Sequence, residues 1–114
     1  MRDKLFLLKP GFMDEGKGPY FCPGCVIVEG MLSFYPFLMD EIEVNYIDFQ
    51  RPRVSLVSLI GEENQTCPKL ILGGEHSVPD GINIDKANEN TYISDPLEIC
   101  LYLGKIYNAG IPHD

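Results

Sequence analysis

The stretch Cys22-Pro23-Gly24-Cys25-Val26-Ile27-Val28 decides the fold, because it marks the point where a helix begins. Apolar residues continue from it at helical spacing, at positions 27, 28, 31, 34 and 35, and Pro36 then ends the run. Proline suits the first turn of a helix, where its missing N–H costs no hydrogen bond. The sequence therefore predicts a helix that starts beside Cys22 and ends before Pro36.

Upstream and downstream of this helix, the chain alternates between predicted strands and helices. Residues Lys4–Leu8 are typical of a short buried strand, and the glycine-rich stretch Gly11–Phe21 indicates a loop. Later we expect a strand over 43–49, a helix over 54–60 that Gly61 stops, a strand over 70–72, a polar excursion over 75–90 with a brief strand at 82–85, a returning edge strand over 91–93, and a closing helix over 97–107.

The predicted order is strand, helix, strand, helix, strand, strand, helix. A crossover through one helix indicates a parallel pair for the first two strands, and the late hairpin supplies an antiparallel edge. We therefore expect an α/β sandwich: a mixed sheet of about four strands flanked by three helices (βαβαββα). A length of 114 residues fits a single domain over residues 1–114.

Composition and charge exclude several classes of function. A formal net charge of −8 argues against a nucleic-acid partner, because phosphate neutralisation needs clustered lysine and arginine. The longest apolar runs, such as Cys25–Val28, are too short to span a bilayer, so we expect no membrane partner. Only Leu5–Leu8 is apolar near the start, with a lysine on each side, and a signal peptide needs a longer run. We therefore expect a cytoplasmic protein, in which cysteines are redox-active, metal-binding or buried rather than structural disulfides.

Cys22 and Cys25 are the candidate catalytic residues. At the start of a helix, the sulfur of Cys22 faces unpaired backbone N–H groups and the positive end of the helix dipole. Both favour the thiolate, which makes Cys22 the expected nucleophile. Cys25, one helical turn deeper, is placed to resolve a mixed disulfide by attacking the same sulfur. Cys100, between two apolar residues of the closing helix, is expected to be a small buried side chain.

Three short motifs carry a family resemblance: the Cys22–Cys25 motif after a first strand, Thr66-Cys67-Pro68 before a third, and Ser94-Asp95 at the start of the last helix. Together they resemble the thioredoxin superfamily, most closely glutaredoxins and the N-terminal domain of glutathione transferases, and suggest a bacterial family with that thioredoxin-like fold. The resemblance implies thiol–disulfide exchange with a protein or small-molecule disulfide, with glutathione as a candidate co-substrate and no other cofactor required.

The resemblance also implies further site residues. It makes Pro68 a cis-proline packed against the cysteines, with Thr66 and Cys67 beside it in the substrate groove. Polar residues at the start of the last helix hold the γ-glutamyl end of glutathione in the family, which points to Ser94 and Asp95. Basic residues that would meet a glutathione carboxylate are Lys17, Arg51 and Arg53. Ser94 or Asp95 is also expected to cap the last helix.

Two positions depart from the family pattern and keep alternatives open. Gly24 stands where glutaredoxins usually carry an aromatic residue, and Cys67 stands where isoleucine or valine is common. A third thiol near Cys22 and Cys25 would allow a competing disulfide or a three-thiolate site. The alternatives are therefore a metal or iron–sulfur carrier that uses Cys22, Cys25 and Cys67, and a non-catalytic binding module that uses the excursion over 75–90.

Overall fold

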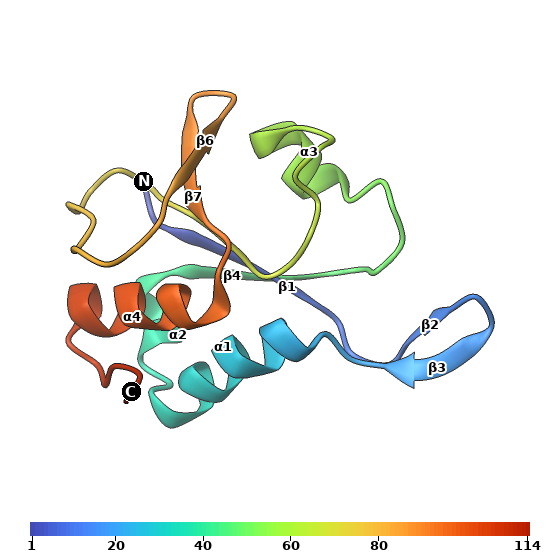
Figure 1. Ribbon diagram of the computed structural model, residues 1–114, viewed down its shortest axis with the longest axis horizontal. Helices are drawn as coiled ribbons and strands as arrows, with labels where there is room; N and C mark the ends of the chain where they lie inside the picture. The colour runs from blue at the N-terminus through green and yellow to red at the C-terminus, as the bar shows by residue number, and fades with distance from the viewer.

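A computed structural model describes residues 1–114 and has a mixed five-stranded sheet at its centre, with strand order β4-β1-β5-β7-β6 (Figure 1). The strands are β1 (Lys4–Leu8), β4 (Glu43–Ile47), β5 (Lys69–Ile71), β6 (Asp85–Ala87) and β7 (Asn90–Ile93). Strands β1 and β4 are parallel, and every other neighbouring pair is antiparallel. The predicted parallel pair and the predicted antiparallel hairpin are both confirmed.

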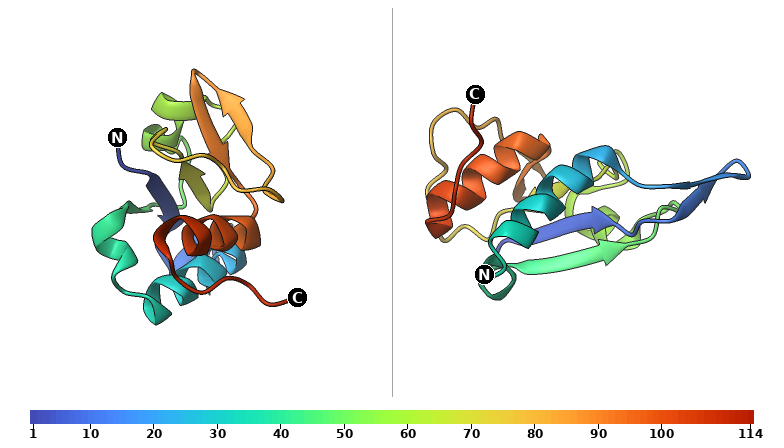
Figure 2. Two further views of the ribbon diagram at one scale, coloured as in Figure 1. Left: turned by 90° about the vertical axis from the view of Figure 1, so that its left-hand side faces the viewer. Right: turned by 90° about the horizontal axis from the view of Figure 1, so that it is seen from below.

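Helices cover both faces of this sheet. The long helices α1 (Pro23–Phe34) and α4 (Pro96–Tyr107) lie side by side on one face, and α3 (Val54–Ile60) lies on the other (Figure 2). Alternate residues of a strand point to opposite faces. Accordingly, Leu5 and Leu7 of β1 belong to the core cluster under α1 and α4, whereas Phe6 belongs to the cluster under α3. The fold is thus a layered α/β sandwich with two apolar cores.

The stretch Gly11–Phe21, predicted as a loop, is instead a β-hairpin made of β2 (Phe12–Asp14) and β3 (Lys17–Tyr20). Its turn residues Glu15 and Gly16 both have positive φ, at 52° and 75°, the conformation that two-residue hairpin turns favour. Gly16, one of the glycines that suggested a loop, therefore serves a tight turn. The hairpin projects from the end of the sheet (Figure 1), and the ring of Phe12 stacks on Phe49 with centroids 4.3 Å apart.

Three further elements differ from the prediction. A short helix α2 (Leu38–Glu41) follows α1, so there are four helices rather than three. The brief strand expected at 82–85 lies later, as β6, and pairs with β7. Strand β6 is therefore the edge of the sheet, and β7, expected at the edge, is internal. The sheet has five strands rather than about four, because Asp85–Ala87 of the long excursion pair with β7 and add an edge strand.

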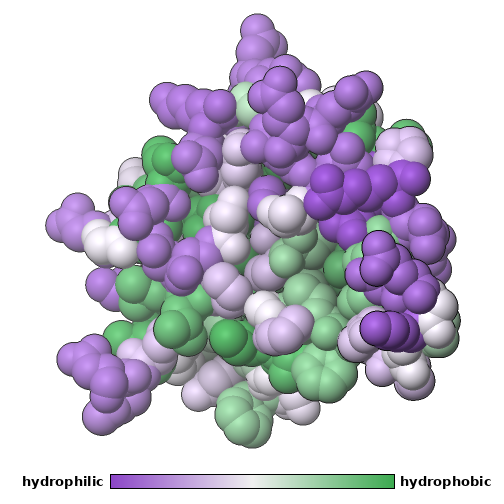
Figure 3. Space-filling view, turned by 45° about the vertical axis from the view of Figure 1, so that its right-hand side comes forward, coloured by the Kyte–Doolittle hydropathy of each residue, from purple (hydrophilic) through white to green (hydrophobic).

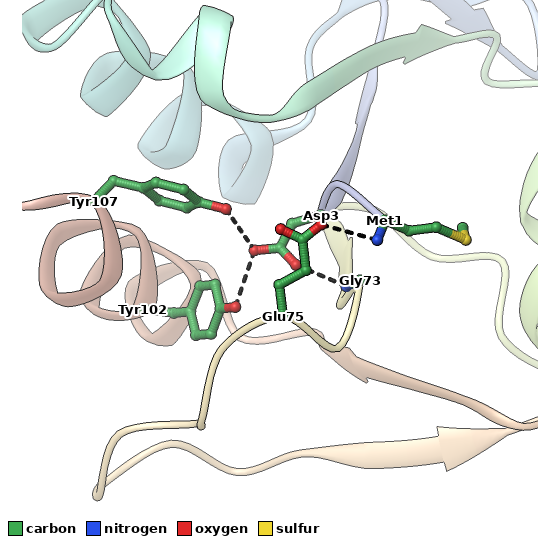
Figure 4. Close-up of polar contacts among 6 residues, drawn as sticks. All are labelled: Met1, Asp3, Gly73, Glu75, Tyr102 and Tyr107. Carbon is green, nitrogen blue, oxygen red and sulfur yellow. Dashed lines mark hydrogen bonds and ion pairs between the residues drawn. The ribbon is translucent and has the colours of Figure 1, made fainter.

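At the start of β1, a buried carboxylate ties together three distant segments (Figure 4). Asp3 is 2% exposed and accepts hydrogen bonds from the hydroxyls of Tyr102 and Tyr107, at 2.9 and 2.8 Å, and from the backbone N–H of Gly73, at 2.7 Å. Burial, together with Asp3, raises the pKa of both tyrosines. Hydrogen bonds to a charged acceptor are among the stronger ones in proteins. This network fixes α4 to the sheet.

Removal of one donor should therefore weaken the fold. The Tyr102→Phe variant leaves the buried Asp3 carboxylate with two donors, and we expect the free energy of unfolding to fall by about 1.5–3 kcal/mol. The measurement is a urea titration followed by circular dichroism. Tyr20→Phe is the control, because Tyr20 is 43% exposed, and it should change stability by less than about 0.5 kcal/mol. Equal midpoints for the two variants would contradict a structural role for the network.

Candidate functional site

Cys22 caps the N-terminus of α1, as the sequence predicts. Its sulfur accepts a hydrogen bond from the backbone N–H of Cys25 at 3.2 Å, and Pro23 occupies the first helical position. The same thiol donates to the backbone carbonyl of Cys67, with 3.5 Å between sulfur and oxygen. Cys22 is half-buried rather than enclosed. The helix end therefore supplies this sulfur with an N–H donor and the positive end of a dipole.

Cys25 lies beneath Cys22 and differs from it in burial. It is 5% exposed, and the backbone N–H of Leu8 donates to its sulfur at 3.4 Å. Burial, and then the neighbouring Cys22, raise the pKa of the Cys25 thiol well above its ordinary value. All four cysteines of the chain are free thiols in this structure. Cys22 is thus the outer thiol and Cys25 the inner one.

Pro68 packs directly against this motif. The peptide bond between Cys67 and Pro68 is cis, which confirms what the family resemblance implies. A Cβ atom built on Gly24 would lie 3.0 Å from a ring carbon of Pro68 and 3.0 Å from a ring carbon of Pro96. Both contacts are closer than ordinary van der Waals distance. The departure at Gly24 therefore has a physical reason: two proline rings occupy the space that a side chain would need.

Cys67 lies between the thiol motif and a pair of buried cations. It is half-buried, and burial raises the pKa of its thiol to about 11, although the positive charge of Arg53 acts in the opposite direction. The guanidinium of Arg53 is buried and donates to the backbone carbonyls of Phe49 and Gln65. Arg53 therefore holds the segment after β4 rather than standing free to meet a ligand.

Lys69 is a buried cation that sequence reasoning missed. It is 3% exposed, and its ammonium group donates to the hydroxyl of Thr66 at 2.7 Å. A lysine inside an otherwise apolar strand was the available signal, but alternation alone does not show that its side chain points under α3. Thr66, predicted to line the substrate groove, is exposed. Its hydroxyl is the acceptor of this hydrogen bond from Lys69.

The structure gathers some of the remaining predicted residues and separates others. The side chain of Asp95 caps α4 by accepting a hydrogen bond from the backbone N–H of Glu98 at 2.9 Å, so the predicted cap is confirmed. Because Pro96 lies against Gly24, Ser94 and Asp95 lie at the same end of the molecule as the thiols. Arg51 is exposed. Lys17 lies next to the turn of the projecting hairpin, so the structure does not bring it together with the cysteines (Figure 1).

A hollow of about 280 Å³ opens beside the two cysteines, and Pro68, expected beside them in the substrate groove, does not line it. We call it the thiol hollow. Besides Cys22 and Cys25, its lining consists of one polar pair, Glu29 and Tyr46, and the apolar residues Leu7, Leu8, Pro10, Phe21 and Val26. The hydroxyl of Tyr46 donates to the carboxylate of Glu29 at 2.6 Å, and burial, then Glu29, raise the pKa of Tyr46 to about 12.

The structure contains neither a cluster of metal-ligating side chains nor a membrane-spanning helix. No three histidine, cysteine, aspartate or glutamate side chains are placed to hold one metal ion. None of the four helices combines the length and hydropathy needed to cross a bilayer.

Comparison with known proteins identifies the family but not an activity. The sequence model of the family described as "Protein of unknown function (DUF3088)" matches residues 2–112. The chain belongs to the DUF3088 family. No curated protein and no solved structure matches it. Any function therefore has to be argued from the geometry of this DUF3088 chain itself.

The contacts of Gly24 predict opposite effects for two glycine substitutions in α1. Gly24→Ala should lower the free energy of unfolding by about 1–3 kcal/mol, because the new methyl group collides with Pro68 and Pro96. Gly30→Ala should raise it by about 0.5–1 kcal/mol, because Gly30 lies inside the helix with open space around it. Thermal or urea unfolding of both variants provides the measurement. A stabilising Gly24→Ala would show that the three segments do not meet there.

Differences in exposure predict an order of thiol labelling. In the folded protein at pH 7.5, iodoacetamide should modify Cys22 first and Cys67 more slowly, whereas Cys25 and Cys100 should resist until the protein unfolds. The thiolate is the reacting form, and burial raises the pKa of Cys25, Cys67 and Cys100. Peptide mapping by mass spectrometry at successive times checks this order. Modification of Cys25 ahead of Cys22 would reverse the proposed outer and inner roles.

Proposed function

We propose that this protein is a thiol–disulfide oxidoreductase with a thioredoxin-like fold. The observation that carries the proposal is the setting of Cys22: its sulfur caps α1, accepts the Cys25 N–H at 3.2 Å and is half-buried rather than enclosed. A second thiol lies beneath it and the ring of Pro68 packs beside the motif. This is the arrangement that nucleophilic attack on a disulfide requires.

The order of elements supports the thioredoxin-like part of the proposal. Without the projecting hairpin, the short helix α2 and the edge strand β6, the chain runs β1, α1, β4, α3, β5, β7, α4. That order is βαβαββα, which the family resemblance implies. The three extra elements are insertions between these units, and none interrupts the contact of α1 with β5 and α4 around Gly24.

The proposed reaction has two exchange steps. The Cys22 thiolate attacks one sulfur of a substrate disulfide; the S–S bond breaks, and the other half leaves as a thiolate that takes up a proton. Cys25 then gives up its proton and attacks the Cys22 sulfur, which releases the second half as a thiol and leaves a Cys22–Cys25 disulfide. The substrate gains two electrons, and the protein loses two. Two molecules of a small thiol such as glutathione, acting as co-substrate, would reduce this disulfide back to two thiols and leave as their own disulfide.

The polar residues around the thiols have subsidiary roles in this proposal. Ser94, Asp95, Thr66 and Arg51 would contact the substrate backbone or its polar ends, together with the main chain of Cys67. Such a protein would work in a reducing compartment such as the cytoplasm, where thiols are kept reduced.

The activity is tested by turnover of a small mixed disulfide with glutathione and glutathione reductase as the recycling system. Wild-type protein should reduce it, and Cys22→Ser should lose at least about a hundredfold in rate, because serine is not a nucleophile toward disulfides at neutral pH. Without glutathione, Cys25→Ser should accumulate a mixed disulfide on Cys22, visible by mass spectrometry. Cys100→Ala is the matched control, because Cys100 is buried in α4 and should leave the rate unchanged.

Two results would overturn the proposal. If Cys22→Ser retains the wild-type rate, the sulfur at the helix end is not the nucleophile. If the wild-type protein neither reduces the disulfide nor forms an adduct on Cys22, the exchange activity is wrong and only the alternative of a binding module remains.

A further inference from the structure

The proposed exchange steps assign no role to the thiol hollow. Both Cys22 and Cys25 line it, whereas Cys67 and Pro68 do not. It lies between β1 and α1, next to the base of the projecting hairpin, which contributes Phe21 and Pro10 to its wall. Any group that enters the hollow therefore lies directly beside the attacking sulfur. Its volume of about 280 Å³ is at the small end of ligand pockets and suits one side chain rather than a large ligand.

The walls of the hollow favour an apolar occupant. Leu7 and Leu8 form its floor from β1, and Val26 and Phe21 remain 51% and 60% exposed at its sides. Apolar residues also gather on the surface around α1, in the lower half of the space-filling view, whereas polar residues cover the upper half (Figure 3). Burial of apolar surface against these walls is favourable, because it removes that surface from water.

Charge around the hollow disfavours an anionic occupant. Its one ionisable carboxylate, Glu29, is held by the Tyr46 hydroxyl, and no lysine, arginine or histidine lines the hollow. A carboxylate on the substrate would therefore face a like charge with no cation to offset it. Glutathione carries carboxylates at both ends, so its charge does not match this side of Cys22.

We propose that the thiol hollow selects disulfides in which an apolar side chain lies next to the reacting sulfur, as in a peptide with phenylalanine or leucine beside its cysteine. This inference rests on the proposed exchange activity and names the substrate class of the same site. Glutathione then serves to recycle the cysteine pair rather than as the preferred substrate.

Two peptide substrates test the inference. They have the same sequence except for phenylalanine or aspartate before the single cysteine, and each is in mixed disulfide with 2-mercaptoethanol. The rate at which the reduced wild-type protein reacts with each peptide in a single turnover is measured by chromatography. Each rate is then divided by the rate at which dithiothreitol reduces the same peptide, because dithiothreitol reports the reactivity of the disulfide without any binding site. The phenylalanine peptide should react at least about tenfold faster after this correction.

Substitutions in α1 test whether the hollow causes the preference for the phenylalanine peptide. Val26→Lys places a positive charge in the hollow and should reduce the phenylalanine-to-aspartate ratio to about one, by slowing the phenylalanine peptide and favouring the aspartate peptide. Ile27→Lys is the matched control: it makes the same kind of change at the next residue of the helix, which is 44% exposed but does not line the hollow, and it should keep the ratio. Glu29→Gln, a conservative surface change, should speed the aspartate peptide several-fold.

The outcomes separate this inference from the proposed function. Equal corrected rates for the two peptides with wild-type protein would overturn the role of the hollow and leave the exchange activity standing. A ratio that survives both Val26→Lys and Glu29→Gln would also overturn it. Failure to reduce either peptide would overturn the exchange activity, and the inference with it.

Discussion

The structure depends on a contact made possible by the absence of one side chain. Gly24, in the first turn of α1, lies against the rings of Pro68 and Pro96, so the starts of α1 and α4 and the residue before β5 meet at this point. A methyl group at this position would press on both rings. This convergence sets where the Cys22 sulfur lies relative to the Cys67 carbonyl, because each sits within two residues of the contact. The chemistry of the site thus depends on close packing of backbone and proline rings.

Strand β1 connects this contact with a second anchor at the opposite end of the sheet. At its start, Asp3 receives two tyrosine hydroxyls from α4; at its end, the Leu8 N–H donates to the sulfur of Cys25. Helix α4 is therefore fixed near its C-terminus to Asp3 by polar contacts and near its N-terminus to α1 by the contact of Pro96 with Gly24. Two anchors on one helix restrain its position in the fold.

Local pattern was enough to predict the elements with a strong local signal. Helical spacing after Pro23, the Asp95 cap and the glycine stop at Gly61 all describe what the chain does within a few residues, and the structure confirms each. The projecting hairpin was missed because its signal lay in two turn residues, Glu15 and Gly16, inside a polar, glycine-rich stretch.

Contacts between distant residues were harder to predict. The Asp3 network joins residues about a hundred positions apart, and the burial of Arg53 depends on Phe49 and Gln65 placing carbonyls around its guanidinium. The thiol hollow is a space left between β1, α1 and β4, and no sequence period reports such a space. By contrast, the motif Cys22–Cys25 was recognisable because a helix start changes the chemistry of a sulfur locally.

The two sides of Cys22 differ in charge, and this difference gives the proposed reaction a direction. On the side of Cys67, the charges of Arg53, Lys69 and Arg51 all act on that thiol, although the chain as a whole carries a net charge of −8. On the side of the thiol hollow, the walls are mostly apolar and the one carboxylate is that of Glu29. When a disulfide breaks, negative charge develops on the leaving sulfur, and preorganised positive charge stabilises it. In the proposed reaction the half that stays bonded to Cys22 therefore occupies the hollow, and the leaving thiolate departs on the side of the cations.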